Sequence, residues 1–103
     1  MYVGRDFSPA DPDEVEVYAF DFVKDINAGE DIDSATFTLT VIEGTDASVN
    51  SRLAGGSSVT GTVCSQRLQD LQPGVRYLLR CIAFTSNGNE VSLYSHILCK
   101  EMV

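Results

Sequence analysis

The feature that most constrains the fold is a strict alternation of apolar and polar residues at positions 34–41, SATFTLTV. Every second position is apolar, and a serine and three threonines fill the others; the apolar residues are Ala35, Phe37, Leu39 and Val41. Successive side chains of a β-strand point to opposite faces of the sheet, so this period of two buries one face and leaves the other in water. The segment therefore predicts a half-buried strand.

Similar short segments recur at intervals of about ten residues, which is typical of an all-β domain. Strands are expected at 15–22, 34–41, 59–64, 75–84 and 91–99, with a further short one at 49–53. Loops are expected at 27–31, 43–48, 54–58 and 86–89, the last a tight hairpin with Asn87 and Gly88 at its positive-φ positions. Helical periodicity is absent. The prediction is all-β: a single antiparallel β-sandwich of about six to seven strands, immunoglobulin- or fibronectin-III-like, with a small barrel as the competitor.

The chain of 103 residues has room for one domain with its own core. Residues 1–13 are polar and contain two prolines, so they are predicted to form an extended N-terminal arm, and residues 14–103 the β-sandwich domain. The arm has few sizeable apolar residues (Tyr2, Val3 and Phe7), so we expect it to contribute little to the core. No signal peptide and no membrane-spanning run of ~20 apolar residues is present. We expect a complete polypeptide made in the cytosol, with no membrane partner.

A second local signal is QDLQPGVRYLLRCIAF at 69–84. A proline followed by a glycine turns the chain, since proline restricts φ and glycine tolerates positive φ. The stretch resembles the LxPGxxYxLxxxA signature of fibronectin type III domains. The resemblance implies a tyrosine corner, in which a tyrosine hydroxyl bonds to upstream backbone as the chain crosses between sheets. The corner residues would be Leu71, Pro73, Gly74 and Tyr77. Position 79 is leucine where antibody-type domains have cysteine, so their inter-sheet disulfide is not expected.

The net charge of -8 lies in the first third of the chain. Residues 1–33 hold ten acidic and two basic side chains, which accounts for all of it, whereas residues 34–103 hold five of each. Nucleic-acid binding needs clustered lysine and arginine, so no nucleic-acid partner is expected. The acidic segment is consistent with a basic or neutral protein partner or with a plain solvated surface.

The three cysteines, Cys64, Cys81 and Cys99, are odd in number and spaced by 17 and 18 residues. This pattern is typical neither of a paired disulfide framework nor of a CxxC metal site. We expect reduced thiols that serve as small buried hydrophobes.

No set of residues in the sequence predicts an active site. His96 is the only histidine and is expected to be a half-exposed strand residue. GGSS at 55–58 lacks the lysine of a phosphate-binding loop and is interpreted as an ordinary loop. Asp31 and Asp33 do not complete a calcium-loop pattern. We therefore expect no catalytic residues, no metal, no cofactor and no enzyme activity, but a binding or structural protein.

One strand has apolar residues on both faces. Opposite Tyr77, the strand at 75–84 carries Leu78, Ile82 and Phe84 around an arginine. An apolar row on the side expected to face water indicates that something covers it. A protein partner, the N-terminal arm and a barrel-like closure are the three alternatives.

The order of several motifs resembles a family of small bacteriophage proteins, the fiber-tail adaptors. The most distinctive match is the run Asp11, Pro12, Asp13, Glu14 that opens DPDEVEVYAFDF, followed by a Gly-acid-x-Ile turn at 29–32 and the strand SATFTLT. A Gly-Gly pair at 55–56, Tyr77 and the hairpin Asn-Gly at 87–88 follow in matching order.

The resemblance implies a virion structural protein at the phage tail, synthesised in the host bacterial cytoplasm. It would link tail fibers to the portal or tail tube, in several copies around the tail axis, with the DPDE run as a docking element. Its partners would be other virion proteins and copies of itself. A capsid decoration protein or another head-tail connector component is the alternative. A secreted adhesion or sugar-binding module is less well supported, because the chain has no tryptophan.

Overall fold

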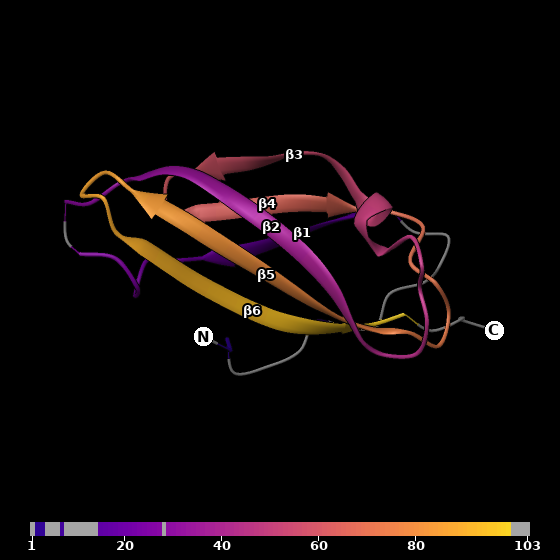
Figure 1. Ribbon diagram of the computed structural model, residues 1–103. Coiled ribbons are helices and arrows are strands. Elements are labelled where there is room, and N and C mark those ends of the chain that lie inside the picture. The colour runs from indigo at the N-terminus through magenta and orange to yellow at the C-terminus, as the bar shows by residue number, and fades with distance from the viewer. Residues whose placement is uncertain (1, 4–6, 8–14, 28, 100–103) are drawn as a thin grey trace.

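The computed structural model describes residues 2–3, 7, 15–27 and 29–99 (Figure 1). Its elements are β1 (Glu16–Asp21), β2 (Ile32–Glu43), a short 3₁₀ helix η1 (Val49–Arg52), β3 (Leu53–Thr60), β4 (Val63–Leu68), β5 (Arg76–Thr85) and β6 (Glu90–Leu98). The strands form two three-stranded sheets in the orders β1-β4-β3 and β2-β5-β6, and all neighbours pair antiparallel. The prediction of an all-β antiparallel sandwich is confirmed.

The strand order explains how consecutive strands come to lie in different sheets. β2 leaves the sheet of β1, β3 returns to it, and β5 crosses back to pair with β2. The orders β1-β4-β3 and β2-β5-β6 are the same as those of strands B-E-D and C-F-G in immunoglobulin constant domains. This topology places each sheet's apolar face against that of the other sheet.

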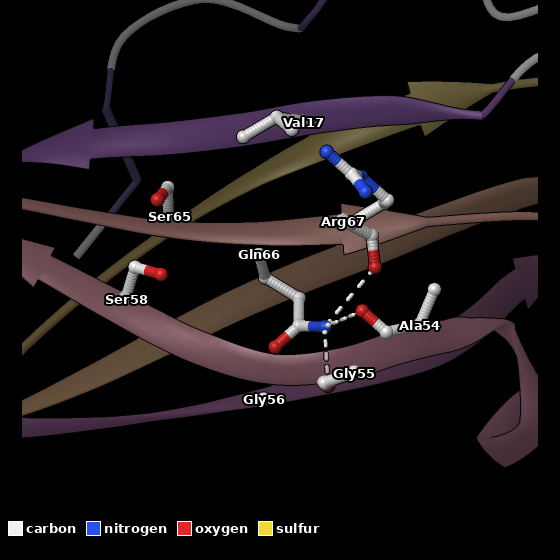
Figure 2. Close-up of a pocket in the computed structure, with 8 residues that line it drawn as sticks. All are labelled: Val17, Ala54, Gly55, Gly56, Ser58, Ser65, Gln66 and Arg67. Carbon is white, nitrogen blue, oxygen red and sulfur yellow. Dashed lines mark hydrogen bonds between the residues drawn. The ribbon is translucent and has the colours of Figure 1, made fainter.

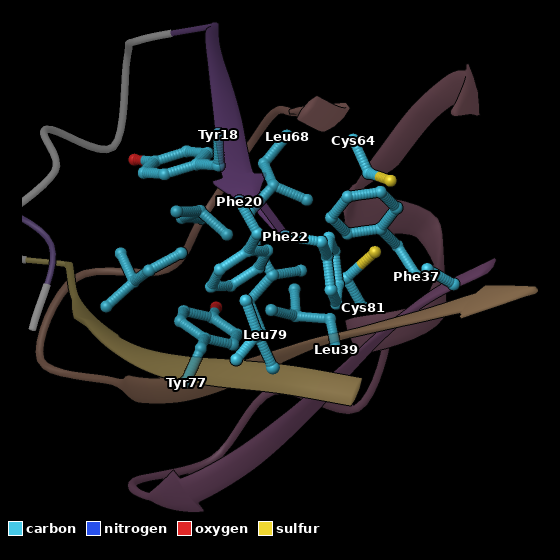
Figure 3. Packing of buried hydrophobic residues seen from close by; sticks show 14 of the residues in the cluster. Tyr18, Phe20, Phe22, Phe37, Leu39, Cys64, Leu68, Tyr77, Leu79 and Cys81 are labelled. Atoms are coloured by element: carbon cyan, nitrogen blue, oxygen red, sulfur yellow. The ribbon is translucent and has the colours of Figure 1, made fainter. Parts of the chain in front are cut away.

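The core lies between the two sheets, and the alternation in the sequence decides which side chains enter it (Figure 3). β1 and the residue after it contribute three aromatic side chains, Tyr18, Phe20 and Phe22, and β2 contributes Phe37 and Leu39. Phe20 and Phe37 stack across the core with ring centroids 6.2 Å apart. Burying a large apolar side chain stabilises a fold by about 1.5–3 kcal/mol, so these strands dominate its stability.

All three cysteines are fully buried and free, as the sequence predicted. The thiols of Cys64 and Cys81 point toward each other from opposite sheets and are hydrogen-bonded, and burial raises the pKa of both (Figure 3). High pKa values and burial leave little reactive thiolate.

We therefore expect native protein to resist alkylation by iodoacetamide, and denatured, unreduced protein to gain three adducts by mass spectrometry. Reduced, denatured protein is the control. A single adduct before reduction would reveal an internal disulfide, for which Cys64 and Cys81 are the pair placed to form it.

Three local predictions between β2 and β4 are wrong. The segment 49–53 is mainly the helix η1, not a strand. The predicted strand 59–64 is a hairpin, because Gly61 (φ +61°) turns the chain and Thr60 then pairs with Val63. In the sequence, Gly61 fits the alternation of a continuous strand. In the structure it adopts positive φ, which glycine can do without steric cost, and the strand ends there.

The segment 55–58 is also not a loop but the middle of β3. Its register against β4 shifts between Ala54 and Ser58, which marks a bulge around the two glycines. The hairpin between β5 and β6 differs from its prediction as well, because Gly88 alone adopts positive φ (+82°) and Thr85 N–H donates to the carbonyl of Asn89. The loop thus spans three residues, 86–88, a length that glycine at the last position favours.

The two sheets meet along two edges, called seams below, and arm residues that the structure describes cover the seam between β1 and β6. Val3 and Phe7 donate backbone hydrogen bonds to the carbonyls of Tyr94 and His96 on β6, each at 3.0 Å. The ring of Phe7 packs edge-on against Tyr18 and Phe20, with centroids 4.9 and 5.5 Å away. The expectation that the arm contributes little to the core is therefore wrong for Phe7. At the other seam, Ser57 of β3 donates to the carbonyl of Ala35 of β2 at 2.7 Å.

Candidate partner-binding surfaces

The predicted corner before β5 is built around the buried ring of Tyr77. Its hydroxyl accepts a hydrogen bond of 2.9 Å from the backbone N–H of Gln72, so the expected bond to upstream backbone is present. Leu71 is buried beside it, Gly74 adopts φ +78°, and Pro73 is exposed at the turn. Of the four predicted residues, Leu71 and Tyr77 are therefore part of the core, and Pro73 and Gly74 form the turn before β5.

A carboxylate that the sequence did not indicate completes the corner. Asp46, between β2 and η1, accepts a hydrogen bond of 2.6 Å from the Tyr77 hydroxyl and two from Arg52, at 3.0 and 2.9 Å. The Asp46 side chain is 1% exposed. Hydrogen bonds from Arg52, and then from Tyr77, lower the pKa of Asp46 to about 2, while burial and this carboxylate raise the pKa of Tyr77 to about 12. The network joins the β2–β3 connection to the start of β5.

A second carboxylate organises the opposite end of the sandwich. Glu30 is only 6% exposed and accepts hydrogen bonds from the Thr85 hydroxyl (2.7 Å), the Asn27 backbone (3.0 Å) and the Asn89 amide (3.1 Å). These bonds, that of Thr85 foremost, lower the pKa of Glu30. The residue ties the β1–β2 loop to the last hairpin. Neither carboxylate resembles a binding site, because each is already occupied by its own chain.

The apolar row predicted on β5 lies on the outer face of the β2-β5-β6 sheet. Leu78, Ile82 and Phe84 are half-buried and alternate with core residues, so they point away from the core. A barrel-like closure does not account for them, because the two sheets pack face to face. On the neighbouring strand β2, small polar residues lie beside this row; Thr36, for example, is opposite Ile82. The outer surface of β5 and β6 is called the β5–β6 face below.

Aromatic and cationic groups extend this face across β6. The Arg80 guanidinium lies 5.4 Å from the ring centroid of Tyr94, and Tyr2 of the arm stacks on His96 with centroids 5.4 Å apart. His96 is half-buried, as predicted. Tyrosine and arginine are over-represented among the residues that dominate binding energy at protein interfaces. Tyr2 of the arm therefore covers part of the β6 side of this face.

The other predicted docking residues, Asp11, Pro12, Asp13 and Glu14, lie outside the described residues. The described part of the chain brings together no group of three or more histidine, cysteine or acidic side chains that could hold a metal. It also contains no helix with the length and hydropathy needed to span a membrane.

In the described part of the sandwich the buried carboxylates serve the fold, and the outer face of β5 carries an apolar row that is suited to contact with another protein. Comparison with known families gives the particular class. Residues 10–94 match the family described as podophage GP4 fiber-tail adaptor protein gp77, and because the match spans most of the chain, the chain belongs to this family. The resemblance found in the sequence is confirmed. No curated protein and no solved structure matched the chain.

Membership identifies the chain with a family of structural phage tail adaptors, which implies a location in the virion and binding to other virion proteins such as the tail fiber.

Proposed function

We propose that the chain links the tail fibers of a podophage to its portal or tail tube, in several copies around the tail axis. The observation that carries the proposal is the family match over residues 10–94. The chain acts as a binding part without catalysis, cofactor, nucleic acid or membrane. Its partners are the neighbouring tail proteins and other copies of itself.

Two surfaces are assigned to these contacts. The β5–β6 face offers Leu78, Ile82 and Phe84 as an apolar centre with polar residues around it, which is the usual arrangement of a protein interface. The run from Asp11 to Glu14 serves as an acidic docking element, and its proline limits the entropy lost on binding.

Ile82→Lys tests the first surface. A lysine on an outer strand position leaves the core intact but introduces a charge at the centre of the proposed interface, so we expect the amount of adaptor in purified particles to fall by more than about tenfold. The measurement is quantitative mass spectrometry of particles assembled with each variant. Thr60→Lys, an exposed position at the end of β3, is the matched control and should assemble normally.

Normal incorporation of folded Ile82→Lys protein would reject the β5–β6 face as an interface. The tail role is tested separately by image reconstruction of intact particles. Density for this chain on the capsid shell, rather than between the portal and the fibers, would refute the proposed function.

A further inference from the structure

The outer face of the β1-β4-β3 sheet, on the far side of the core from the β5–β6 face, contains a groove of about 280 Å³ (Figure 2). Val17 of β1 and Arg67 of β4 stand opposite each other at one side of it, and the bulge of β3 with Gly55 and Gly56 forms the other. Val17 is 52% exposed and offers apolar surface at this side of the groove.

The bulge of β3 explains why a groove exists there. Residues 55–57 have no register partner on β4, so the two strands separate locally. The side chain of Gln66 occupies the gap, and its Nε2 donates to the carbonyls of Ala54 (3.3 Å), Gly55 (3.1 Å) and Arg67 (3.0 Å) (Figure 2). The floor of the groove is therefore held in place by the protein itself.

The other end of the same amide is unused. Gln66 is 4% exposed, yet no described residue donates a hydrogen bond to its Oε1. Among the described residues, no side-chain nitrogen or oxygen is both fully buried and without a partner, so this oxygen keeps some contact with solvent, and Gln66 is one of the residues that line the groove. The bonds from Nε2 fix the amide in place, so its oxygen is an acceptor of defined position that suits a ligand with an N–H donor.

The charge of the groove points to the chemistry of the same ligand. Arg67 is exposed, and it is the only charged side chain among the described residues that line the groove. It takes part in no ion pair with the described part of the chain. The remaining lining is small and uncharged, with Ser58 and Ser65 beside the glycines. Such a lining lets a main chain approach closely while an arginine pairs with a carboxylate.

We propose that this groove binds an extended segment of a partner protein that carries an acidic side chain. The carboxylate pairs with Arg67, a backbone N–H of the segment donates to Gln66 Oε1, and an apolar side chain of the segment covers Val17. An extended polypeptide is the ligand class that presents an N–H donor, a carboxylate and apolar surface within a few residues. The proposal concerns a surface other than the β5–β6 face and does not depend on the position of the chain in the particle.

The test uses two probes, the capped peptide acetyl-Gly-Ser-Asp-Val-Ser-Gly-amide and its Asp-to-Asn counterpart. Each peptide is titrated into the ¹⁵N-labelled full chain, and binding is followed by the chemical shifts of the chain's backbone amides. We expect saturable shifts at Gly55, Gly56 and Arg67 with the aspartate peptide, and binding at least about tenfold weaker with the asparagine peptide. Arg67→Gln should abolish the difference between the two peptides. Lys24→Gln, at an exposed position of the β1–β2 loop outside both proposed surfaces, is the matched control and should preserve it.

Gly56→Leu gives an independent test of position. A Cβ at Gly56 would meet no atom within 4 Å and the residue does not adopt positive φ, so the fold should tolerate the change while the side chain narrows the groove. We expect this variant to lose binding of both peptides while its other amide shifts remain those of the folded chain. Equal affinity for the two peptides, shifts centred on β5, or no saturable shift up to about 10 mM peptide would each overturn the proposal.

Discussion

Replacing Asp46 by asparagine should lower the free energy of unfolding by about 3 kcal/mol, which is at the low end of the cost of breaking a buried ion pair. The side chains of Asp46 and Arg52 are 1% and 13% exposed, so the substitution leaves a largely desolvated guanidinium without its carboxylate. It also weakens the acceptor of the Tyr77 hydroxyl. Chemical denaturation at neutral pH measures the change. Asp33→Asn, at an exposed position of β2, is the control and should change stability by less than about 0.5 kcal/mol.

The contribution of Asp46 to stability should depend on pH in a definite direction. Its folded pKa of about 2 lies below the ordinary value of 3.8, so the charged form is favoured by folding. This contribution is complete above pH 3.8 and is lost as the pH falls toward 2; at 1.36 kcal/mol per pH unit it amounts to about 2 kcal/mol. The stability difference between the parent chain and Asp46→Asn should therefore shrink over this window. A stability difference that does not change with pH would contradict the lowered pKa of Asp46 in the folded chain.

Tyr77→Phe tests the contribution of the tyrosine hydroxyl to the network separately from that of the Asp46–Arg52 ion pair. It retains the ring but removes the bonds to Gln72 and Asp46, and it should cost about 1–3 kcal/mol. Combined with Asp46→Asn, the two losses should not add, because Asp46→Asn weakens the same bond between these residues that Tyr77→Phe removes. Additive losses would show that the bond between Tyr77 and Asp46 contributes no coupling energy.

Phe7→Ala should destabilise the fold by about 2 kcal/mol, although the residue belongs to the arm. Its ring packs against Tyr18 and Phe20 while its backbone bonds to β6, so truncation opens the seam between β1 and β6. The loss is smaller than the 3–5 kcal/mol typical of a core phenylalanine, because Phe7 is only partly buried. Thermal and chemical denaturation measure it.

Val3→Ala is the matched control, since Val3 keeps its backbone bond to Tyr94 when the side chain is shortened and is 38% exposed. It should cost less than about 0.5 kcal/mol. Equal stability of Phe7→Ala and the parent chain would show that the arm is independent of the sandwich. If Phe7→Ala has the predicted loss of stability, a deletion of the whole arm would impair folding as well as any docking. Substitutions between Asp11 and Glu14 are therefore the cleaner test of docking.

The faces of the strands could be predicted from the sequence, because alternation within a few neighbouring residues decides which side chains share a face. Phe37 and Leu39 entered the core as this rule requires, and the corner at Tyr77 followed from a local turn. The row on β5 was also visible, since it departs from that alternation. Local patterns failed where one glycine admits two conformations, as at Gly61, which ended a strand that the pattern continued.

Only the tertiary structure decided which distant groups meet. Asp46 and Tyr77 are 31 residues apart in sequence, and Gln66 contacts the bulge carbonyls 11 and 12 residues before it. Nothing in the sequence around Asp46 distinguishes it from a solvated turn residue, and nothing around Gln66 indicates a groove. Such pairings depend on how two sheets stack and on where the register of β3 shifts, and these are properties of the whole packed chain. A buried polar atom acquires its role only there, because its partner comes from another strand.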